Sequence, residues 1–305
     1  MKKIIIAGGT GFLGECLSSF YLTKGFQVII LTRKQQADKA PLFYHKWDGK
    51  SIGDWAETLE NAEALINLTG KSVDCRYNER NKQLIYDSRL DATRILGLAV
   101  AACRIPPKVW INAASATIYR HSLDKPMDEE TGEVGTGFSV DVCKKWEAAF
   151  NEQKVPQTRK IILRISIVLG YEKGALQPLK NLAKLGMGGK QGPGNQYFSW
   201  IHERDFVNII DFVIQNREME GVYNVAAPHP VSNSQLMDHI RRILKIPFSI
   251  PMPSWLLRIG AVLIKTETEL ILKSRYVVPQ KLLQKNYTFE FPTIEKALND
   301  LLKKT

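Results

Sequence analysis

Three glycines near the amino terminus, Gly8, Gly11 and Gly14, have a spacing that could bind a phosphate group. They follow a short apolar run at residues 4–7 and lead into a helical pattern at residues 12–22. In a turn between a strand and a helix, glycines let the backbone approach a pyrophosphate, and N–H groups at the start of the helix can bind it. The pattern favours a dinucleotide-binding turn over a glycine-rich turn without a ligand.

The end of the second predicted strand, residues 27–32, indicates which dinucleotide would bind. Enzymes that use NAD usually carry an acidic residue there, which holds the ribose 2′-hydroxyl. This chain has Thr32, Arg33 and Lys34 instead. The planar fork of donors on Arg33 can bind a 2′-phosphate, and Lys34 adds a second positive charge. We therefore predict NADP(H) as the cofactor, with a solvated basic loop as the alternative.

Other chemistry-bearing residues should gather beyond the carboxyl ends of the strands, where open α/β sheets bind their ligands. Asp48 follows a third predicted strand, residues 68–70 follow a fourth, and residues 114–117 close a fifth. The last of these ends includes the hydroxyl of Ser115.

The elements that must position these residues alternate along the chain. Predicted strands lie at residues 4–7, 27–32, 43–47, 64–68, 109–114 and 160–165, and predicted helices at 12–22, 54–59, 78–103 and 140–150. This rhythm is typical of a doubly wound parallel sheet covered on both faces. We predict an α/β fold with an NADP-binding Rossmann domain over residues 1–175 and a smaller C-terminal α/β lobe over residues 176–305.

The second half of the chain is expected to form mainly the substrate lobe. Elements near residues 197–225 should return to the first domain, and a helical segment at about 247–300 should belong to the lobe. A strand is predicted at 196–201, and Asp205 is expected to cap a helix over 206–215. Ser232 or Ser234 is expected to cap a helix that runs through Leu244.

Composition narrows the class of protein. With 305 residues, 44% of them hydrophobic, the chain can bury a full core. The net charge of +11 comes from scattered Lys and Arg residues, which favours attraction for an anionic cofactor or substrate over nucleic-acid binding. The four cysteines and five histidines show no metal-ligand spacing, so we expect no metal and a reduced, cytoplasmic setting. The apolar stretch at 255–264 is too short to span a bilayer, and we predict no membrane association.

Several longer strings carry a resemblance to a known family. The segments GGTGFLG, NLTG, SATIY and WIHERD resemble the extended short-chain dehydrogenase/reductase superfamily, of the sugar-nucleotide epimerase kind. The strings GMGGKQGPGNQYFSWIHERD, GVYNVAAPHPVSN and VVPQKLLQKNYTFEFP resemble an atypical branch labelled "epimerase family protein", which is NAD-dependent epimerase/dehydratase-like and has a short C-terminal domain of unknown function. The similarity covers nearly the whole chain.

The resemblance implies an NADP(H)-binding Rossmann domain and a set of cofactor-binding residues. That set comprises Gly8, Thr10, Gly11, Phe12, Leu13 and Gly14 at the pyrophosphate, Thr32, Arg33 and Lys34 at the 2′-phosphate, Asp48 near the adenine, and Leu68, Thr69 and Gly70 near the central riboses. Ser115 falls at the family's catalytic Ser/Thr position. Arg89, in a polar notch of the long helix, is a further cofactor candidate or an exposed helix charge.

The chain departs from its relatives at the residues that carry the chemistry. They have a Tyr and a Lys separated by three residues on the next helix, with a Glu four residues after the Lys. When Glu147 is aligned with that Glu, Cys143 falls at the Lys position and Ser139 at the Tyr position. A serine hydroxyl cannot replace the phenol as a base, and we interpret Cys143 as a small buried helix residue. Tyr119 is the candidate substitute acid, or a tyrosine that packs its ring under the loop.

Candidate substrate-binding residues each have a structural alternative. They are Arg120, Arg164, Gln177, Lys190 and His202, and the glycine-rich loop around Lys190 is predicted either as a lid or as a surface hairpin. The first hypothesis is an NADP(H)-dependent oxidoreductase or epimerase-like enzyme acting on a small molecule with a carbonyl, alcohol or sugar-nucleotide group. The second is a non-catalytic NADP(H)-binding redox sensor or assembly factor. Oligomeric state is left open, with a homodimer as one option.

Overall fold

The structure, a computed structural model, describes residues 1–34, 36–263 and 267–303. Within these residues seven parallel strands form the main sheet, in the order β3-β2-β1-β4-β5-β6-β10. The strands are β1 (Lys3–Ala7), β2 (Gln27–Thr32), β3 (Leu42–Lys46), β4 (Ala64–Asn67), β5 (Val109–Ser115), β6 (Arg159–Ile165) and β10 (Gly221–Val225). The prediction of a doubly wound α/β fold is confirmed.

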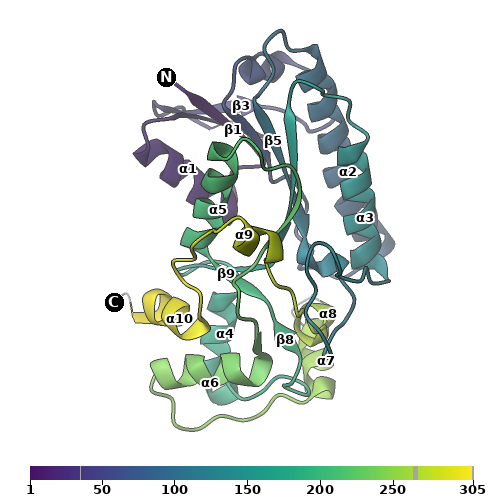
Figure 1. The fold of residues 1–305 in the computed structure, drawn as a ribbon. Helices are drawn as coiled ribbons and strands as arrows, with labels where there is room; N and C mark the ends of the chain where they lie inside the picture. The colour runs from purple at the N-terminus through teal and green to yellow at the C-terminus, as the bar shows by residue number, and fades with distance from the viewer. Residues whose placement is uncertain (35, 264–266, 304–305) are drawn as a thin grey trace.

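Helices cover both faces of this sheet, as Figure 1 shows. On one face lie α1 (Phe12–Thr23) and α5 (Glu203–Gln215), and on the other lie α2 (Glu79–Ala102) and α3 (Phe138–Asn151). Alternate residues of each strand belong to opposite cores: Ile4 packs with α1 and α5, whereas Ile5 packs with α2. Because both faces of the central strands are buried, β1, β2 and β4 are mainly apolar, which is why they were predictable as short hydrophobic runs.

The chain leaves the main sheet after β6 and builds the lobe below its carboxyl edge (Figure 1). Strand β7 (Ile167–Leu169) pairs with β9 (Trp200–His202), and β8 (Tyr197–Phe198) pairs with β11 (Val231–Ser232). Of the segments near 197–225, β10 joins the main sheet beside β6, whereas β8 and β9 lie in these two small sheets. The helices of this region are α4 (Leu176–Leu182), α6 (Asn233–Ile243), α7 (Ser254–Leu263), α8 (Glu269–Leu272), α9 (Gln280–Gln284) and α10 (Ile294–Lys303), and the short helical turns of the chain are η1 (Asp54–Leu59), η2 (Ala116–Ile118) and η3 (Ala183–Met187).

The start of α5 differs from the prediction. The helix begins at Glu203, and His202 caps it, with its Nδ1 accepting a hydrogen bond from the Arg204 N–H at 3.0 Å. The Asp205 carboxylate is fully buried and accepts the backbone N–H groups of Glu290 and Phe291, each at 2.8 Å. The expected cap at Asp205 is therefore wrong, because this carboxylate fastens the C-terminal segment to α5.

Two other expectations for the second half can be checked. Ser232 caps α6 through a reciprocal pair of hydrogen bonds with Gln235, so of the two predicted caps, Ser232 and Ser234, the first is confirmed. The apolar stretch at 255–264 lies in α7, except for its last residue, which is outside the described ones. Among the helices that the structure describes, none combines the length and apolar character needed to cross a membrane.

Candidate functional site

A groove of about 1040 Å³ opens at the carboxyl edge of the main sheet. Its walls come from the turn after β1, the end of β2, the turn after β4 and one face of α2. It brings together most of the residues predicted to bind a cofactor: Gly8, Thr10, Gly11, Thr32, Arg33, Lys34, Asp48, Leu68, Thr69 and Gly70. This lining does not include the predicted residues Phe12, Leu13, Gly14 and Arg89.

The glycines of the first turn have different physical roles. Gly8 has a φ of +74°, and a Cβ on it would lie 3.0 Å from the Thr69 backbone. A Cβ on Gly14 would lie 2.2 Å from the Gly9 carbonyl oxygen, so the fold itself requires glycine there. Around Gly11, beyond its chain neighbours, no described atom lies within 4 Å of such a Cβ. Gly11 is therefore the glycine that leaves space for a ligand.

The start of α1 faces this space with unused donors. Gly11 is the N-cap, and the first helical hydrogen bond runs from the Glu15 N–H to the Gly11 carbonyl at 2.9 Å. The N–H groups of residues 12–14 therefore have no acceptor within the helix and can bind an anion. The Phe12 ring packs toward Gly170, since a Cβ there would lie 2.2 Å from the ring, so the Phe12 side chain does not line the groove.

The β2 end of the groove carries positive charge. Arg33 and Lys34 are exposed, and neither side chain forms an ion pair with a residue that the structure describes. The neighbouring Asp48 carboxylate accepts the Lys50 and Ser51 N–H groups at 2.8 and 2.9 Å. Hydrogen bonds from Ser51 and Lys50 lower the pKa of Asp48 to about 2, so this carboxylate is ionised and occupied by its own turn. Arg33 and Lys34 remain available to an anion.

Two buried asparagines fix the turn at residues 68–70, and sequence reasoning did not select them. Asn67 and Asn112 lie side by side in register on β4 and β5, and the Asn67 Nδ2 donates to the Asn112 Oδ1 at 2.7 Å. The Asn67 Oδ1 accepts the Thr69 N–H at 3.1 Å, which sets the turn. The signal that could have identified them is an asparagine in each of two apolar strands, Asn67 at the end of β4 and Asn112 within β5.

Arg89 lies behind this turn and not in the groove wall. Its Nη1 donates to the carbonyl oxygens of Lys71 and Ile85, each at 3.1 Å, and its guanidinium lies 5.0 Å from the centre of the Trp146 ring. A Cβ on Gly70 would lie 2.9 Å from the guanidinium carbon. Arg89 is partly buried, and burial lowers its pKa, so it is a cation that supports the turn and not the exposed helix charge of the alternative prediction.

The two predicted catalytic residues lie in different surroundings. Ser115 ends β5, is partly exposed, and its Oγ accepts the Thr117 N–H at 3.2 Å. Tyr119 is 1% exposed; its hydroxyl donates to the Asn224 Oδ1 at 3.0 Å and accepts from the Arg164 Nη1 at 2.9 Å. Tyr119 thus has the packed placement of the structural alternative, and its hydroxyl is fully engaged, so we do not retain it as a substitute acid.

The helix that carries the Tyr and Lys of the relatives offers no replacement base. Cys143 is 4% exposed, and burial, aided by the charge of Glu147, raises its pKa to about 11, so the thiol is neutral at physiological pH. Glu147 itself forms a two-bond ion pair with Arg164, with both N–O distances at 2.8 Å. The Ser139 hydroxyl donates to the Glu269 Oε2 at 3.0 Å.

None of the five predicted substrate residues lines the groove. Arg120 forms ion pairs with Asp124 and Glu133 at the surface, and Arg164 forms one with Glu147. The Gln177 amide donates to the Asn181 side chain, and Lys190 is exposed. His202 is fully buried, caps α5 and stacks on Phe291.

The loop around Lys190 is tied to the lobe by its backbone. The Gly192 N–H donates to the Met252 carbonyl at 2.8 Å, and the Met252 N–H donates to the Lys190 carbonyl at 2.9 Å. The buried Gln191 N–H donates to the Asn233 side chain at 2.8 Å. These bonds favour a packed connection over a lid.

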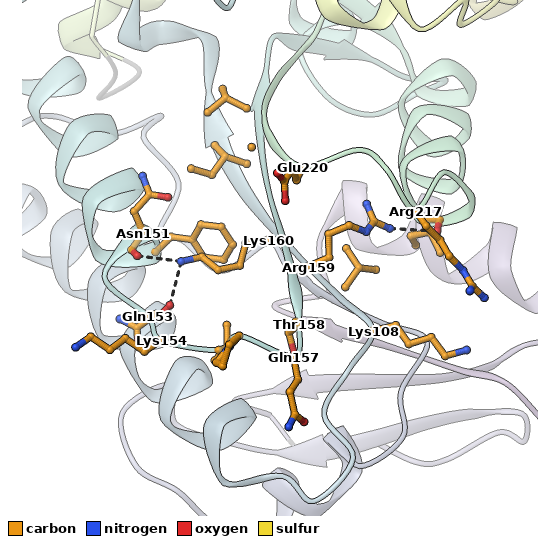
Figure 2. Close-up of a pocket in the computed structure, with 18 of the residues that line it drawn as sticks. Lys108, Asn151, Gln153, Lys154, Gln157, Thr158, Arg159, Lys160, Arg217 and Glu220 are labelled. Atoms are coloured by element: carbon orange, nitrogen blue, oxygen red, sulfur yellow. Dashed lines mark hydrogen bonds between the residues drawn. The ribbon is translucent and has the colours of Figure 1, made fainter.

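A second cavity, of about 1110 Å³, lies at the opposite, amino edge of the sheet (Figure 2). Two of its basic residues, Arg159 and Lys160, are bound to helix ends. The Lys160 Nζ donates to the carbonyl oxygens of Asn151 and Gln153 at 2.9 and 3.0 Å, after the end of α3. Arg159 donates to the Val213 and Met219 carbonyls at 3.0 and 2.6 Å, around the end of α5. Cations at helix carboxyl ends stabilise the fold, so Arg159 and Lys160 have a structural role here.

Comparisons with known proteins agree with the groove geometry. The model of the "NAD dependent epimerase/dehydratase family" matches residues 4–226, and that of "Domain of unknown function (DUF1731)" matches residues 252–301. The chain is 29% identical to the human epimerase family protein SDR39U1, covering 98% of this chain and 99% of the relative. It is 31% identical to the Bacillus subtilis epimerase family protein YfhF, covering 98% of each. The crystal structure of human SDR39U1 (isoform2) with NADPH superposes with a TM-score of 0.89 and 28% identity, over 99% of this chain and 100% of that one.

Proposed function

This chain belongs to the NAD dependent epimerase/dehydratase family, and from that premise we propose that it binds NADP(H) and transfers hydride between the nicotinamide and a carbonyl or alcohol of a small molecule. The observation that carries the proposal is the groove, in which a glycine turn, a helix N-terminus and Arg33 follow one another. The NADPH in the crystal structure of human SDR39U1 supports the choice of cofactor.

The residues along the groove fit such a dinucleotide in order. The free N–H groups of residues 12–14 would bind the pyrophosphate, and Arg33 with Lys34 would bind the 2′-phosphate. When bound, the nicotinamide supplies or accepts the hydride. Because the Ser115 Oγ already accepts the Thr117 N–H, its own hydrogen is free to be donated to a substrate oxygen near the end of β5.

A second function is favoured by one observation. Ser139 and Cys143 stand where relatives have the Tyr and Lys, and both are engaged or neutral in this structure. A protein that binds NADP(H) without turnover, as a redox sensor or assembly factor, would need the groove and not those two residues. Tight cofactor binding that alters affinity for a protein partner, without oxidation of NADPH by any carbonyl compound, would support this alternative.

The cofactor assignment is tested by titrating NADPH and NADH against the wild type, Arg33→Ala and Arg242→Ala, with nicotinamide fluorescence as the signal. Loss of charge-assisted hydrogen bonds to the 2′-phosphate should weaken NADPH binding by roughly 10- to 100-fold in R33A. NADH binding should not change. Arg242 is an exposed cation on α6 and serves as the matched control. Equal affinity of the wild type for the two cofactors would refute the assignment.

A further inference from the structure

A segment of the C-terminal lobe, residues 267–278, contacts the carboxyl end of β5 close to Ser115. The Lys273 Nζ donates to the Thr117 carbonyl at 2.8 Å, and the Arg275 Nε donates to the Thr117 Oγ1 at 3.3 Å. From α8 in the same segment, Glu269 accepts the Ser139 hydroxyl at 3.0 Å. Figure 1 shows α8 below the ends of α2 and α3. The lobe therefore delivers charged groups to the place where relatives carry their Tyr and Lys.

Two positive charges are buried together in this segment. The Lys273 side chain is 10% exposed and Arg275 is 7% exposed. Among the described residues, the one carboxylate within 4 Å of the Lys273 Nζ is Glu269, at 3.9 Å, and that side chain is 36% exposed. Burial of neighbouring like charges is unfavourable for folding and is characteristic of sites that act on a ligand.

We propose that Lys273 is the proton donor and acceptor of this chain, with Arg275 as the positioning cation beside it. The pair replaces the Tyr and Lys that relatives carry on the helix equivalent to α3. This inference rests on the proposed hydride-transfer function. In the reducing direction the carbonyl carbon of the substrate accepts a hydride from the reduced nicotinamide, so its π bond to oxygen opens. The oxygen takes a proton from the Lys273 ammonium, which becomes a neutral amine and regains a proton from water.

The charged groups around Lys273 are consistent with this role. Burial lowers the pKa of Lys273, and the adjacent Arg275 lowers it further, whereas Glu269 on α8 and Cys143 on α3 act in the opposite direction. Tyr77 before α2 and Arg89 on α2 face the same cluster, because both interact electrostatically with Cys143 or Arg275. A lowered pKa brings the titration of the amine closer to neutral pH, which is the direction that general acid–base catalysis requires.

The proposal can be tested without knowing the substrate. Lysines of the NADPH-bound protein are methylated with ¹³C-formaldehyde and titrated by NMR, and the Lys273 signal is assigned by its loss in Lys273→Met. We expect Lys273 to titrate below the ordinary value of a lysine side chain, because it is buried beside the positive charge of Arg275. In Arg275→Met the Lys273 titration should move upward, because the neighbouring positive charge that lowers its pKa is removed. A Lys273 that titrates at the ordinary value of a lysine side chain in the wild type would overturn the proposal.

A crystal structure of the NADPH-bound chain gives an independent readout. The Lys273 Nζ should lie within about 6 Å of the nicotinamide C4, near enough for both to reach one carbonyl group. A Nζ that points away from the nicotinamide would also overturn the proposal. NADPH is titrated on the same samples: binding with an unshifted Lys273 refutes only this inference, whereas a wild type that does not bind NADPH refutes the proposed function. K273M should retain the melting temperature of the wild type, and a large drop would assign Lys273 a structural role.

Discussion

Two alanine substitutions in the first turn should separate the glycine that the fold needs from the glycine that the ligand needs. Gly11 and Gly14 differ in what a new methyl group would meet. At Gly14 it would lie 2.2 Å from the Gly9 carbonyl oxygen, so α1 or the turn must shift by about 1 Å to restore contact distance. At Gly11, beyond its chain neighbours, it would meet no described atom within 4 Å.

The expected magnitudes follow from these contacts. Overpacking against backbone should destabilise Gly14→Ala by about 3 kcal/mol, which corresponds to a drop in melting temperature of about 5–10 °C. Gly11→Ala changes only an N-cap glycine with φ of −99°, so its cost should stay below about 1 kcal/mol. The new methyl group of G11A would nevertheless occupy the space where a pyrophosphate approaches the backbone, and NADPH binding should weaken at least about tenfold.

The assay combines thermal unfolding with fluorescence titration of NADPH and NADH. In G11A both cofactors should lose affinity to the same extent, because the pyrophosphate is common to them, whereas R33A should affect NADPH alone. Wild-type affinity in G11A would refute the assignment of this turn to the pyrophosphate. A G14A protein as stable as the wild type would show that the close contact with Gly9 is not a constraint on the fold.

Two further predictions concern buried charge and a buried thiol. Arg164→Met should destabilise the protein by about 3–5 kcal/mol, because it leaves the buried Glu147 unpaired, and Glu147→Leu in the same chain should recover most of that loss. Denaturant unfolding of the single and double variants measures both effects. A double variant as unstable as Arg164→Met would contradict the argument. Cys143 should resist iodoacetamide in the folded protein at pH 8, since its pKa of about 11 keeps the thiol neutral. The free energy of unfolding should fall as pH rises from about 9 toward 11, because the thiol of the unfolded chain ionises first. Rapid labelling of Cys143 in the native protein, found by peptide mass spectrometry, would contradict the assigned neutral thiol.

The order of strands and helices in the first domain was predictable because local signals decide it. The apolar runs of β1, β2 and β4 are buried on both faces, and the amphipathic pattern of α2 faces the sheet. The predicted strand at 196–201 was less predictable. It is divided at Ser199, whose Oγ donates to the Arg275 carbonyl at 2.6 Å and accepts the Val277 N–H at 2.8 Å. A partner from a distant segment decided that break, and no local pattern contains it.

The same distinction explains which parts of the candidate site were predictable. The groove is built from turns whose residue types are fixed by local backbone geometry, and the predicted residues gather there. Tyr119 could not be placed from its neighbours in sequence, because its partners Arg164 and Asn224 lie 45 and 105 positions away. Asp205 follows the same rule: a carboxylate near a helix start looks like a cap until its partners at residues 290 and 291 are known.

The serine at position 139 and the position of Lys273 at the end of β5 are structurally connected. Ser139 is small enough for its hydroxyl to meet Glu269 at 3.0 Å, and Glu269 begins the short helix that precedes Lys273. The hydrogen bond between Ser139 and Glu269 therefore links α3 to the segment whose Lys273 donates to the Thr117 carbonyl at 2.8 Å. Under the proposed function, the glycine turn would hold the cofactor, whereas the proton-transfer group would come from the segment of the lobe that contacts the end of β5.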